Sequence, residues 1–397
     1  MAERIQLAVV GGGPAGLRAA EVAAGAGVKV VLFDAKPSVG RKFLVAGKGG
    51  LNLTNGEEAA SFITRYSGPG QPDGFWEHLI GSCDAEVMRA WAAGMGVETF
   101  EAKNGRIYPR EMKAAPLLRR WIARLRDMGV RFEMNHRWTG IIPGAPHVLE
   151  FSNGTVLEAD AVVFALGGAS WPQTGSDGSW VRVFQENGIA CHDLRPANCG
   201  WRHPWTPAVL AAAEGKPMKN ISASAGGVSV DGELLLTRYG LEGGAIYQLG
   251  RVLGKMECPA LTIDFKPTFT VEQLLAKMES VRGGFLAEAR TRWRLGDAAH
   301  AILARREWQD AASLAHEAKH CVIPLDGPQP IEEAISSAGG VCWEELDASL
   351  MVRRFPGIFV AGEMVDWEAP TGGYLIQGCF ATGGHAGKAA AGFVRSA

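Results

Sequence analysis

Five residues near the beginning of the chain have the types and the spacing that bind a pyrophosphate. They lie between an apolar run at residues 5–10 and a helix-forming stretch at residues 17–24. The turn contains Gly11, Gly13, Pro14, Ala15 and Gly16. Its first glycine permits a tight turn, its second lets the backbone approach phosphate, and its third lets the helix pack on the strand. Because the first amides of a helix also bind phosphate, this pattern predicts a dinucleotide site.

An acidic residue stands where a dinucleotide site needs one. Asp34 ends the next apolar run, residues 28–33, and lies 18 residues after Gly16. A carboxylate at this distance accepts a hydrogen bond from a ribose 2′-hydroxyl, and it argues against a 2′-phosphate and therefore against NADP as the resident ligand. The predicted site continues into Ala35 and Lys36.

Three later segments favour FAD over NAD. Residues 40–52 continue a glycine-rich, cationic surface, and the apolar strand at residues 162–166 ends in glycines. Residues 361–363 place an acid, suited to ribityl hydroxyls, after a short strand. A helix that is expected to begin near residues 382–384 would direct its amides at the flavin ring, where reduction builds negative charge.

These segments must be positioned by an α/β domain. Strands and helices alternate over residues 1–190, and the same style returns over residues 335–397. The apolar spacing predicts a helix over residues 114–126, and an Asn-Gly turn predicts a hairpin over residues 148–157. Alternation of this kind is typical of a parallel sheet covered by helices.

The middle of the chain has a different pattern. Residues 220–236 predict a hairpin with Asp231–Gly232 as its turn, residues 260–265 predict a strand, and residues 271–318 are rich in helix formers. We therefore expect a β-barrel-like and helical domain over residues 191–334, inserted into the α/β domain and forming the far wall of a substrate cleft.

Composition places the chain among ordinary globular proteins. It has 397 residues, 47% apolar and 21% charged, and a net charge of -2, which gives no general attraction to nucleic acid or anionic membrane. No apolar run approaches the length of a membrane span, and no signal region follows the first residues, so a cytoplasmic location is expected. The seven cysteines include no CxxC pair, so no metal or dithiol site is predicted.

The chain resembles a bacterial family of two-domain FAD flavoproteins that includes ribosomal dihydrouridine synthase, a bile-acid reductase and aminoacetone oxidase. The resemblance covers nearly the whole chain and rests on residues 11–16, 40–42, 52–55, 105–109, 113–114, 239–241, 337–341, 361–363, 366, 370–374 and 377. It implies a Rossmann-like FAD-binding domain of the glutathione-reductase type, interrupted by an insertion. The chain departs from many members at Gly50–Leu51, where they have Arg-Cys, and at Leu375, where they have Asn; it resembles a distinct subgroup.

The residue patterns and the resemblance together complete the predicted FAD site. Its further members are Arg41, Lys42, Lys48, Gly49, Asn52, Trp138, Ala165, Gly167, Gly362, Glu363, Gly373, Tyr374 and Gln377. Arg41 and Lys42 are predicted to contact phosphate, whereas Lys48 has two open interpretations, a contact at the flavin or a solvated loop charge. Glu363 and Tyr374 are the polar side chains expected to reach the cofactor. No residue is singled out as the catalytic acid.

The predicted function is that of an FAD-dependent oxidoreductase that transfers hydride at flavin N5. Reduction of an activated C=C bond of a small molecule, with NAD(P)H as a transient donor, is favoured because the resemblance includes two such reductases. One alternative is RNA dihydrouridine synthesis, for which arginines at 119–126 and 290–306 would bind phosphates, although the apolar face of the 114–126 helix favours a normal solvated polar face. The other alternative is an amine or amino-ketone oxidase that releases hydrogen peroxide.

Overall fold

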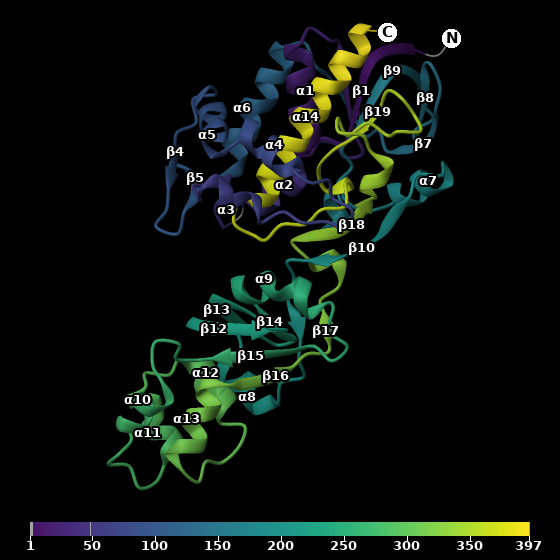
Figure 1. The fold of residues 1–397 in the computed structure, drawn as a ribbon. Helices are drawn as coiled ribbons and strands as arrows, with labels where there is room; N and C mark the ends of the chain where they lie inside the picture. Colours follow the sequence, from purple (N-terminus) through teal and green to yellow (C-terminus); the bar gives the residue numbers. More distant parts are fainter. Residues whose placement is uncertain (1–2, 48, 397) are drawn as a thin grey trace. The chain divides into compact units, whose positions relative to one another are not determined.

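The computed structural model describes residues 3–47 and 49–396 (Figure 1). Its contacts divide the chain into two compact units. The first contains Met1–Arg195 and Ile335–Ala397, and the second contains Pro196–Ala334. The second unit thus begins at residue 196, whereas the sequence pattern predicts that the insertion begins at residue 191.

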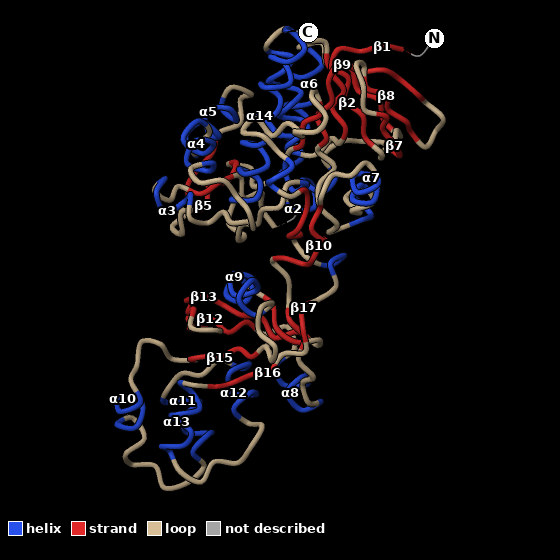
Figure 2. The backbone as a smooth tube through the Cα atoms, turned by 45° about the vertical axis from the view of Figure 1, so that its right-hand side comes forward, coloured by secondary structure: helices blue, strands red, loops and turns tan. Residues whose placement is uncertain are grey.

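The first unit contains a seven-stranded sheet, whose strands β1, β2, β7, β8 and β9 are labelled in Figure 2. Its strands are β1 (Glu3–Val10), β2 (Val30–Asp34), β6 (Arg131–Met134), β7 (Trp138–Ile142), β8 (His147–Phe151), β9 (Val156–Phe164) and β19 (Ile358–Val360). The order is β6-β2-β1-β9-β8-β7, and β19 also pairs with β9. The pairings among β6, β2, β1, β9 and β19 are parallel, whereas β7 and β8 are antiparallel to their neighbours. The predicted 148–157 hairpin is confirmed by β8 and β9.

The parallel strands bring three loops to one edge of this sheet. Residues 7–10 of β1 and 161–164 of β9 are buried, as expected for parallel strands covered on both faces. Val10 is paired with Phe164, and Phe164 is paired with Val360. The segments that follow β1, β9 and β19 therefore begin side by side at the carboxyl edge, where sheets of this kind bind ligands.

Two helices that are far apart in the sequence pack against each other in the first unit. Helix α1 (Pro14–Gly25) and helix α14 (Tyr374–Ser396) pack together, as Figure 1 shows. The predicted helix start near residues 382–384 is wrong, because α14 already begins at Tyr374. A Cβ on Gly383 would lie 2.2 Å from the carbonyl oxygen of Ala15, and one on Gly387 would lie 2.4 Å from that of Ala19. These glycines permit close helix packing and do not mark a turn.

The other elements of the first unit surround this core. Its remaining helices are α2 (Arg41–Ala46), α3 (Ala59–Ile63), α4 (Phe75–Ser82), α5 (Ala85–Ala93), α6 (Ala114–Asp127) and α7 (Trp180–Glu186), with 3-10 turns η1 (Pro172–Thr174), η3 (Trp343–Glu345) and η4 (Gly362–Met364). A small sheet contains β3 (Thr54–Asn55), β4 (Thr99–Glu101) and β5 (Arg106–Pro109), and β10 (Cys191–Ala197) pairs with β18 (Ser336–Val341). Helix α6 confirms the prediction for residues 114–126.

The second unit has its own core beneath an antiparallel sheet. The strands are β11 (Trp201–Arg202), β12 (Pro217–Ala225), β13 (Val228–Thr237), β14 (Gly240–Glu242), β15 (Ala260–Asp264), β16 (Cys321–Pro324) and β17 (Gly327–Pro328). Their order is β16-β15-β12-β13-β14-β11-β17. Its helices are α8 (Pro207–Ala213), α9 (Gly244–Leu253), α10 (Val271–Ala276), α11 (Phe285–Arg292), α12 (Asp297–Leu303) and α13 (Ala311–Lys319), with the 3-10 turn η2 (Ile331–Glu333). The predicted strand at 260–265 and the helices within 271–318 are confirmed.

The hairpin of the second unit turns elsewhere than predicted. Strands β12 and β13 form it, but Asp231–Gly232 lies inside β13, where Gly232 pairs with Ile221 beside a register shift. The turn is at Gly226–Gly227, whose φ values of 53° and 82° suit a tight hairpin turn. The Asp-Gly pair was therefore the wrong turn, because two glycines supply both left-handed positions.

Two further predictions concern absences. Over residues 3–47 and 49–396, no helix combines the length and apolar character that a membrane crossing requires. Within the same ranges, no three His, Cys, Asp or Glu side chains gather as metal ligands.

Candidate FAD site

The turn between β1 and α1 forms a cradle that is open above one glycine. A Cβ on Gly11 would lie 2.2 Å from the carbonyl oxygen of Ala165, and one on Gly16 would lie 1.8 Å from that of Gly11. Gly13 is the residue before α1, no side chain caps this helix end, and a Cβ there would meet nothing within 4 Å. Two glycines thus close the turn, while the third leaves free space beside free amides, which fits a pyrophosphate.

Asp34 is fixed beside this turn. Its Oδ2 accepts a hydrogen bond from the Gly12 amide at 2.9 Å, and its Oδ1 accepts one from the Lys36 amide at 2.8 Å. Burial raises the pKa of Asp34, and the two amides oppose that rise. The Lys36 side chain lies near Gly175, within 3.3 Å of where a Cβ would stand. The carboxylate is therefore held at the end of β2, and each oxygen retains a further lone pair for a ribose hydroxyl.

Lys42 and Glu363 form an ion pair across the site. The Lys42 Nζ donates to Glu363 Oε2 at 2.8 Å and to Ser170 Oγ at 2.6 Å. Lys42 was predicted to contact phosphate and Glu363 to contact ribityl hydroxyls, and the structure brings the two together. Ser170 was missed, although its position just after the glycines that end β9 was a usable signal. Arg41 instead lies at the surface, 3.4 Å from Ser38 Oγ.

Asn52 carries an unsatisfied buried atom. Its Oδ1 is buried and has no hydrogen-bond partner among the residues that the structure describes. Buried acceptors are nearly always paired, so this oxygen is available to a donor such as the N–H group of a flavin. Gly373, just before α14, lies close to β3, which begins two residues after Asn52, since its Cβ would stand 2.5 Å from the carbonyl carbon of Thr54. The orphaned oxygen and the open cradle at Gly13 together fit FAD.

Two side chains that were predicted to contact the cofactor, Tyr374 and Gln377, are hydrogen-bonded to other residues of the chain. Tyr374 donates its hydroxyl to Glu57 Oε2 at 2.7 Å, and Glu57 is paired with Arg65. Burial, with the Glu57 hydrogen bond second, raises the pKa of Tyr374 to about 12. Gln377 is fully buried, donates to the Cys83 carbonyl at 2.8 Å and accepts from the Thr54 hydroxyl. Both side chains anchor the beginning of α14.

Most of the remaining predicted residues lie where a strand ends or a helix begins. Pro14 and Ala15 open α1, Ala165 and Gly167 follow β9, and Gly362 opens η4. The Gly167 carbonyl accepts from Trp180 Nε1 at 2.8 Å, and the Gly362 amide donates to Thr382 Oγ1 at 3.0 Å. Ala35 follows β2, and Gly49 has nothing within 4 Å of a Cβ. Lys48 lies outside the described residues.

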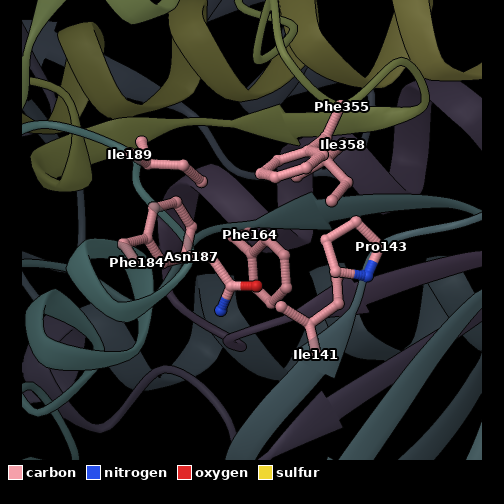
Figure 3. Close-up of a pocket in the computed structure, with 8 residues that line it drawn as sticks. All are labelled: Ile141, Pro143, Phe164, Phe184, Asn187, Ile189, Phe355 and Ile358. Atoms are coloured by element: carbon pink, nitrogen blue, oxygen red, sulfur yellow. The ribbon is translucent and has the colours of Figure 1, made fainter.

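Trp138 packs away from these groups. It is buried, its ring centroid lies 4.6 Å from that of Phe164, and its Nε1 has no partner within the described ranges. A small hollow nearby is lined by Ile141, Pro143, Phe164, Phe184, Asn187, Ile189, Phe355 and Ile358 (Figure 3). None of its lining residues belongs to the predicted site, and Asn187 alone among them has a polar side chain, so this hollow offers no reactive group.

Most of the arginines that suggested RNA binding have partners within the fold. On α6, Arg124 pairs with Glu21 at 3.2 Å, Arg120 donates to the Met95 carbonyl at 3.3 Å, and Arg126 covers the ring of Phe132. In the second unit the ion pairs are Arg290–Asp297, Arg292–Glu288, Arg305–Glu317 and Arg306–Glu317. Acidic side chains pair with five of these arginines, which offsets part of the charge that a phosphate-binding surface would need.

Comparison with known proteins now identifies the family. The model described as "HI0933-like protein Rossmann domain" matches residues 5–389. The chain belongs to this HI0933-like family. It is 26% identical to a 3-dehydro-bile acid delta(4,6)-reductase of Clostridium scindens, over 97% of this chain and 99% of the relative. It is 22% identical to a ribosomal RNA dihydrouridine synthase of Escherichia coli, over 94% of this chain and 95% of the relative.

Solved structures show the fold of this HI0933-like chain. A flavocytochrome c3 fumarate reductase has a TM-score of 0.55 and 16% identity, covering 99% of this chain and 79% of the other. A 3-ketosteroid-delta4-(5alpha)-dehydrogenase of Rhodococcus jostii has a TM-score of 0.53 and 17% identity, covering 98% and 97%. The predicted family and the Rossmann-like α/β fold are confirmed. The protein is an FAD-dependent oxidoreductase, and FAD is its cofactor.

Proposed function

We propose that this protein reduces a carbon–carbon double bond conjugated to a carbonyl group in a small molecule, with a reduced nicotinamide as donor. The supporting observation is the end-to-end similarity to a reductase of 3-dehydro bile acids. The name of the dihydrouridine synthase describes saturation of a double bond in a uracil ring, which is also conjugated to a carbonyl. A cytoplasmic location belongs to the same proposal.

The residues of the candidate site have separate tasks in this proposal. The amides around Gly13 bind the pyrophosphate, and Asp34 accepts from the ribose. Asn52 orients the flavin through its unpaired Oδ1, and the Lys42–Glu363 pair closes the site between η4 and α2. When bound, FAD accepts and delivers hydride at N5. The protein then has to orient the substrate and supply one proton.

RNA dihydrouridine synthesis is the second candidate, favoured by relatives that are 22% and 23% identical. The paired arginines speak against it, because a protein that neutralises RNA phosphates needs free cationic side chains. A small-molecule substrate requires no such surface. The proposal therefore keeps the reaction that the relatives' names share and assigns it to a small ketone.

The test is anaerobic stopped-flow mixing of the FAD-loaded protein with NADH, NADPH and aminoacetone in turn. We expect a reduced nicotinamide to bleach the flavin absorbance and aminoacetone to leave it unchanged. The reduced protein should then regain its absorbance on mixing with 4-androstene-3,17-dione, a ketone with a conjugated double bond. Bleaching by aminoacetone, followed by peroxide release in air, would instead support the oxidase.

A further inference from the structure

A histidine and a buried aspartate form a couple beside the candidate site in the first unit. His192 lies on β10, and its Nδ1 is 2.6 Å from Asp366 Oδ2. The His192 side chain is 53% exposed, whereas that of Asp366 is 2% exposed. One imidazole nitrogen is therefore fixed against a buried carboxylate, and the ring that carries the other nitrogen remains accessible.

The surrounding backbone holds Asp366 in a single position. Its amide donates to the Val341 carbonyl at 3.1 Å, and its carbonyl accepts from Trp343 Nε1 at 2.7 Å. Its Oδ1 accepts from the Gly339 amide at 3.1 Å, which leaves Oδ2 for His192. Among the residues described, no lysine or arginine forms an ion pair with Asp366. His192 is thus the one basic side chain that pairs with this carboxylate there.

The contact with Asp366 determines which nitrogen of the imidazole can exchange a proton. A carboxylate that accepts from Nδ1–H fixes the tautomer and stabilises the protonated ring. The other nitrogen, Nε2, then takes up and releases the proton. Nε2 has no hydrogen bond to the part of the chain that the structure describes, so this nitrogen is available to a bound molecule.

Strand β18 connects the couple to the candidate FAD site. Ser337 Oγ accepts from the Ala169 amide at 3.1 Å, and a Cβ on Gly168 would lie 1.6 Å from this hydroxyl. Two residues further along the same strand, Gly339 binds Asp366. Two residues of strand span about 6.6 Å. Asp366 also follows Glu363 by three residues, so the couple and the loop after β9 share one rigid support.

We propose that His192 is the proton donor of the reaction and that Asp366 is its positioning residue; this inference rests on the proposed function. Hydride adds to one carbon of the conjugated double bond, and the π electron pair moves toward the carbonyl. That pair then forms a C–H bond at the other carbon with the proton of Nε2. The imidazolium becomes a neutral imidazole and regains a proton from water, and a reduced nicotinamide supplies the electrons.

The experiment measures the two half-reactions separately in His192→Gln, His192→Ala and Asp366→Asn. FAD content and the rate of flavin reduction by the nicotinamide should stay at the wild-type level in His192→Gln. After reduction with dithionite, reoxidation by 4-androstene-3,17-dione should be about 100-fold slower or more, the usual effect of removing a general acid. Added imidazole should restore part of the rate in His192→Ala. Asp366→Asn should slow the same step without rescue.

The matched control is His316→Gln, at an exposed histidine of α13 in the second unit. It should react like the wild-type protein. A His192→Gln protein that is reoxidised by the ketone at the wild-type rate would overturn the proposal. So would loss of FAD and of both half-reactions in His192→Ala without rescue by imidazole, because that is the signature of a structural role. Reduced wild-type protein that fails to react with the ketone would contradict the proposed function itself, and the role of His192 with it.

Discussion

The first unit contains two glycine-rich segments that look alike in the sequence and act differently in the fold. Gly11–Gly16 closes a turn and leaves open space above Gly13, whereas the glycines of α14 lie inside a helix. Gly383 and Gly387 bring α14 against the carbonyl oxygens of α1. The first segment keeps room for a ligand, and the second removes room between helices. Glycine spacing alone therefore does not distinguish a binding turn from a packing surface.

The largest effect is expected where glycine leaves space for the ligand. In Gly13→Val, the new side chain would meet no protein atom near its Cβ but would occupy the cradle for pyrophosphate. We expect the protein to fold and the FAD content, measured by flavin absorbance of the purified protein, to fall to a small fraction of the wild-type value.

Gly81→Val is the matched control for that change. Gly81 lies in α4, is exposed and also has nothing within 4 Å of a Cβ. Its FAD content should equal that of the wild type. Full occupancy in Gly13→Val would remove this glycine from the site.

A change at Gly383, which packs α14 against α1, should alter the free energy of unfolding. Gly383→Ala places a Cβ 2.2 Å from the Ala15 carbonyl oxygen, so α1 and α14 must separate. Overpacking of this kind costs about 1–3 kcal/mol, measured as the free energy of unfolding in urea. Gly392→Ala in the same helix has open space and should instead stabilise by about 0.5–1 kcal/mol. Equal effects of the two changes would refute a packing role for Gly383.

Replacing Asn52 should keep or raise the stability of the FAD-free protein and lower its affinity for FAD. Asn52→Leu removes a buried oxygen that lacks a partner, so the FAD-free protein should be as stable as the wild type or more stable. The dissociation constant of FAD should rise roughly tenfold in this variant, which is about 1.4 kcal/mol of binding free energy, because the ligand loses an acceptor. Titration of the apoprotein with FAD, followed by flavin fluorescence, measures the second effect. Unchanged FAD affinity would place Asn52 outside the site.

The smallest effect is expected on the basic face of α6. Arg119→Glu reverses a charge without breaking the ion pair of Arg124 with Glu21. We expect reduction of a small ketone to change less than about twofold, since the median surface charge contributes little. A salt series of fluorescence anisotropy with a ribosomal RNA fragment is the sharper readout. Tight binding that falls steeply with salt and is lost in Arg119→Glu would revive the RNA alternative.

The sequence was sufficient for the first two parallel strands and the glycine turn between them because their signals are local. Apolar strands, a glycine turn and Asp34 lie within a few dozen residues, and each physical requirement is visible in the residue types. The start of α14 was mispredicted because Gly383 is explained only by Ala15, a residue far away in the chain. Asp231–Gly232 failed for a different, local reason, since the nearby Gly226–Gly227 pair supplies both left-handed positions of the turn.

Side-chain partners were the least predictable part of the site. Lys42 and Glu363 were both expected near the cofactor, but their ion pair joins residues 321 positions apart. Tyr374 was expected to reach the cofactor, and its hydroxyl is bound to Glu57. His192 carried no motif, because its significance comes from the buried Asp366 that it meets only in the folded chain.

The most direct measurement combines the reduced protein with a conjugated ketone in the absence of oxygen. The FAD-loaded protein is reduced with one equivalent of NADH or NADPH, mixed with 4-androstene-3,17-dione, and the product is analysed by mass spectrometry. The account predicts that flavin absorbance returns and that the ketone gains two hydrogens. Flavin that stays reduced with the ketone, yet is reoxidised at once by air with release of hydrogen peroxide, would contradict it.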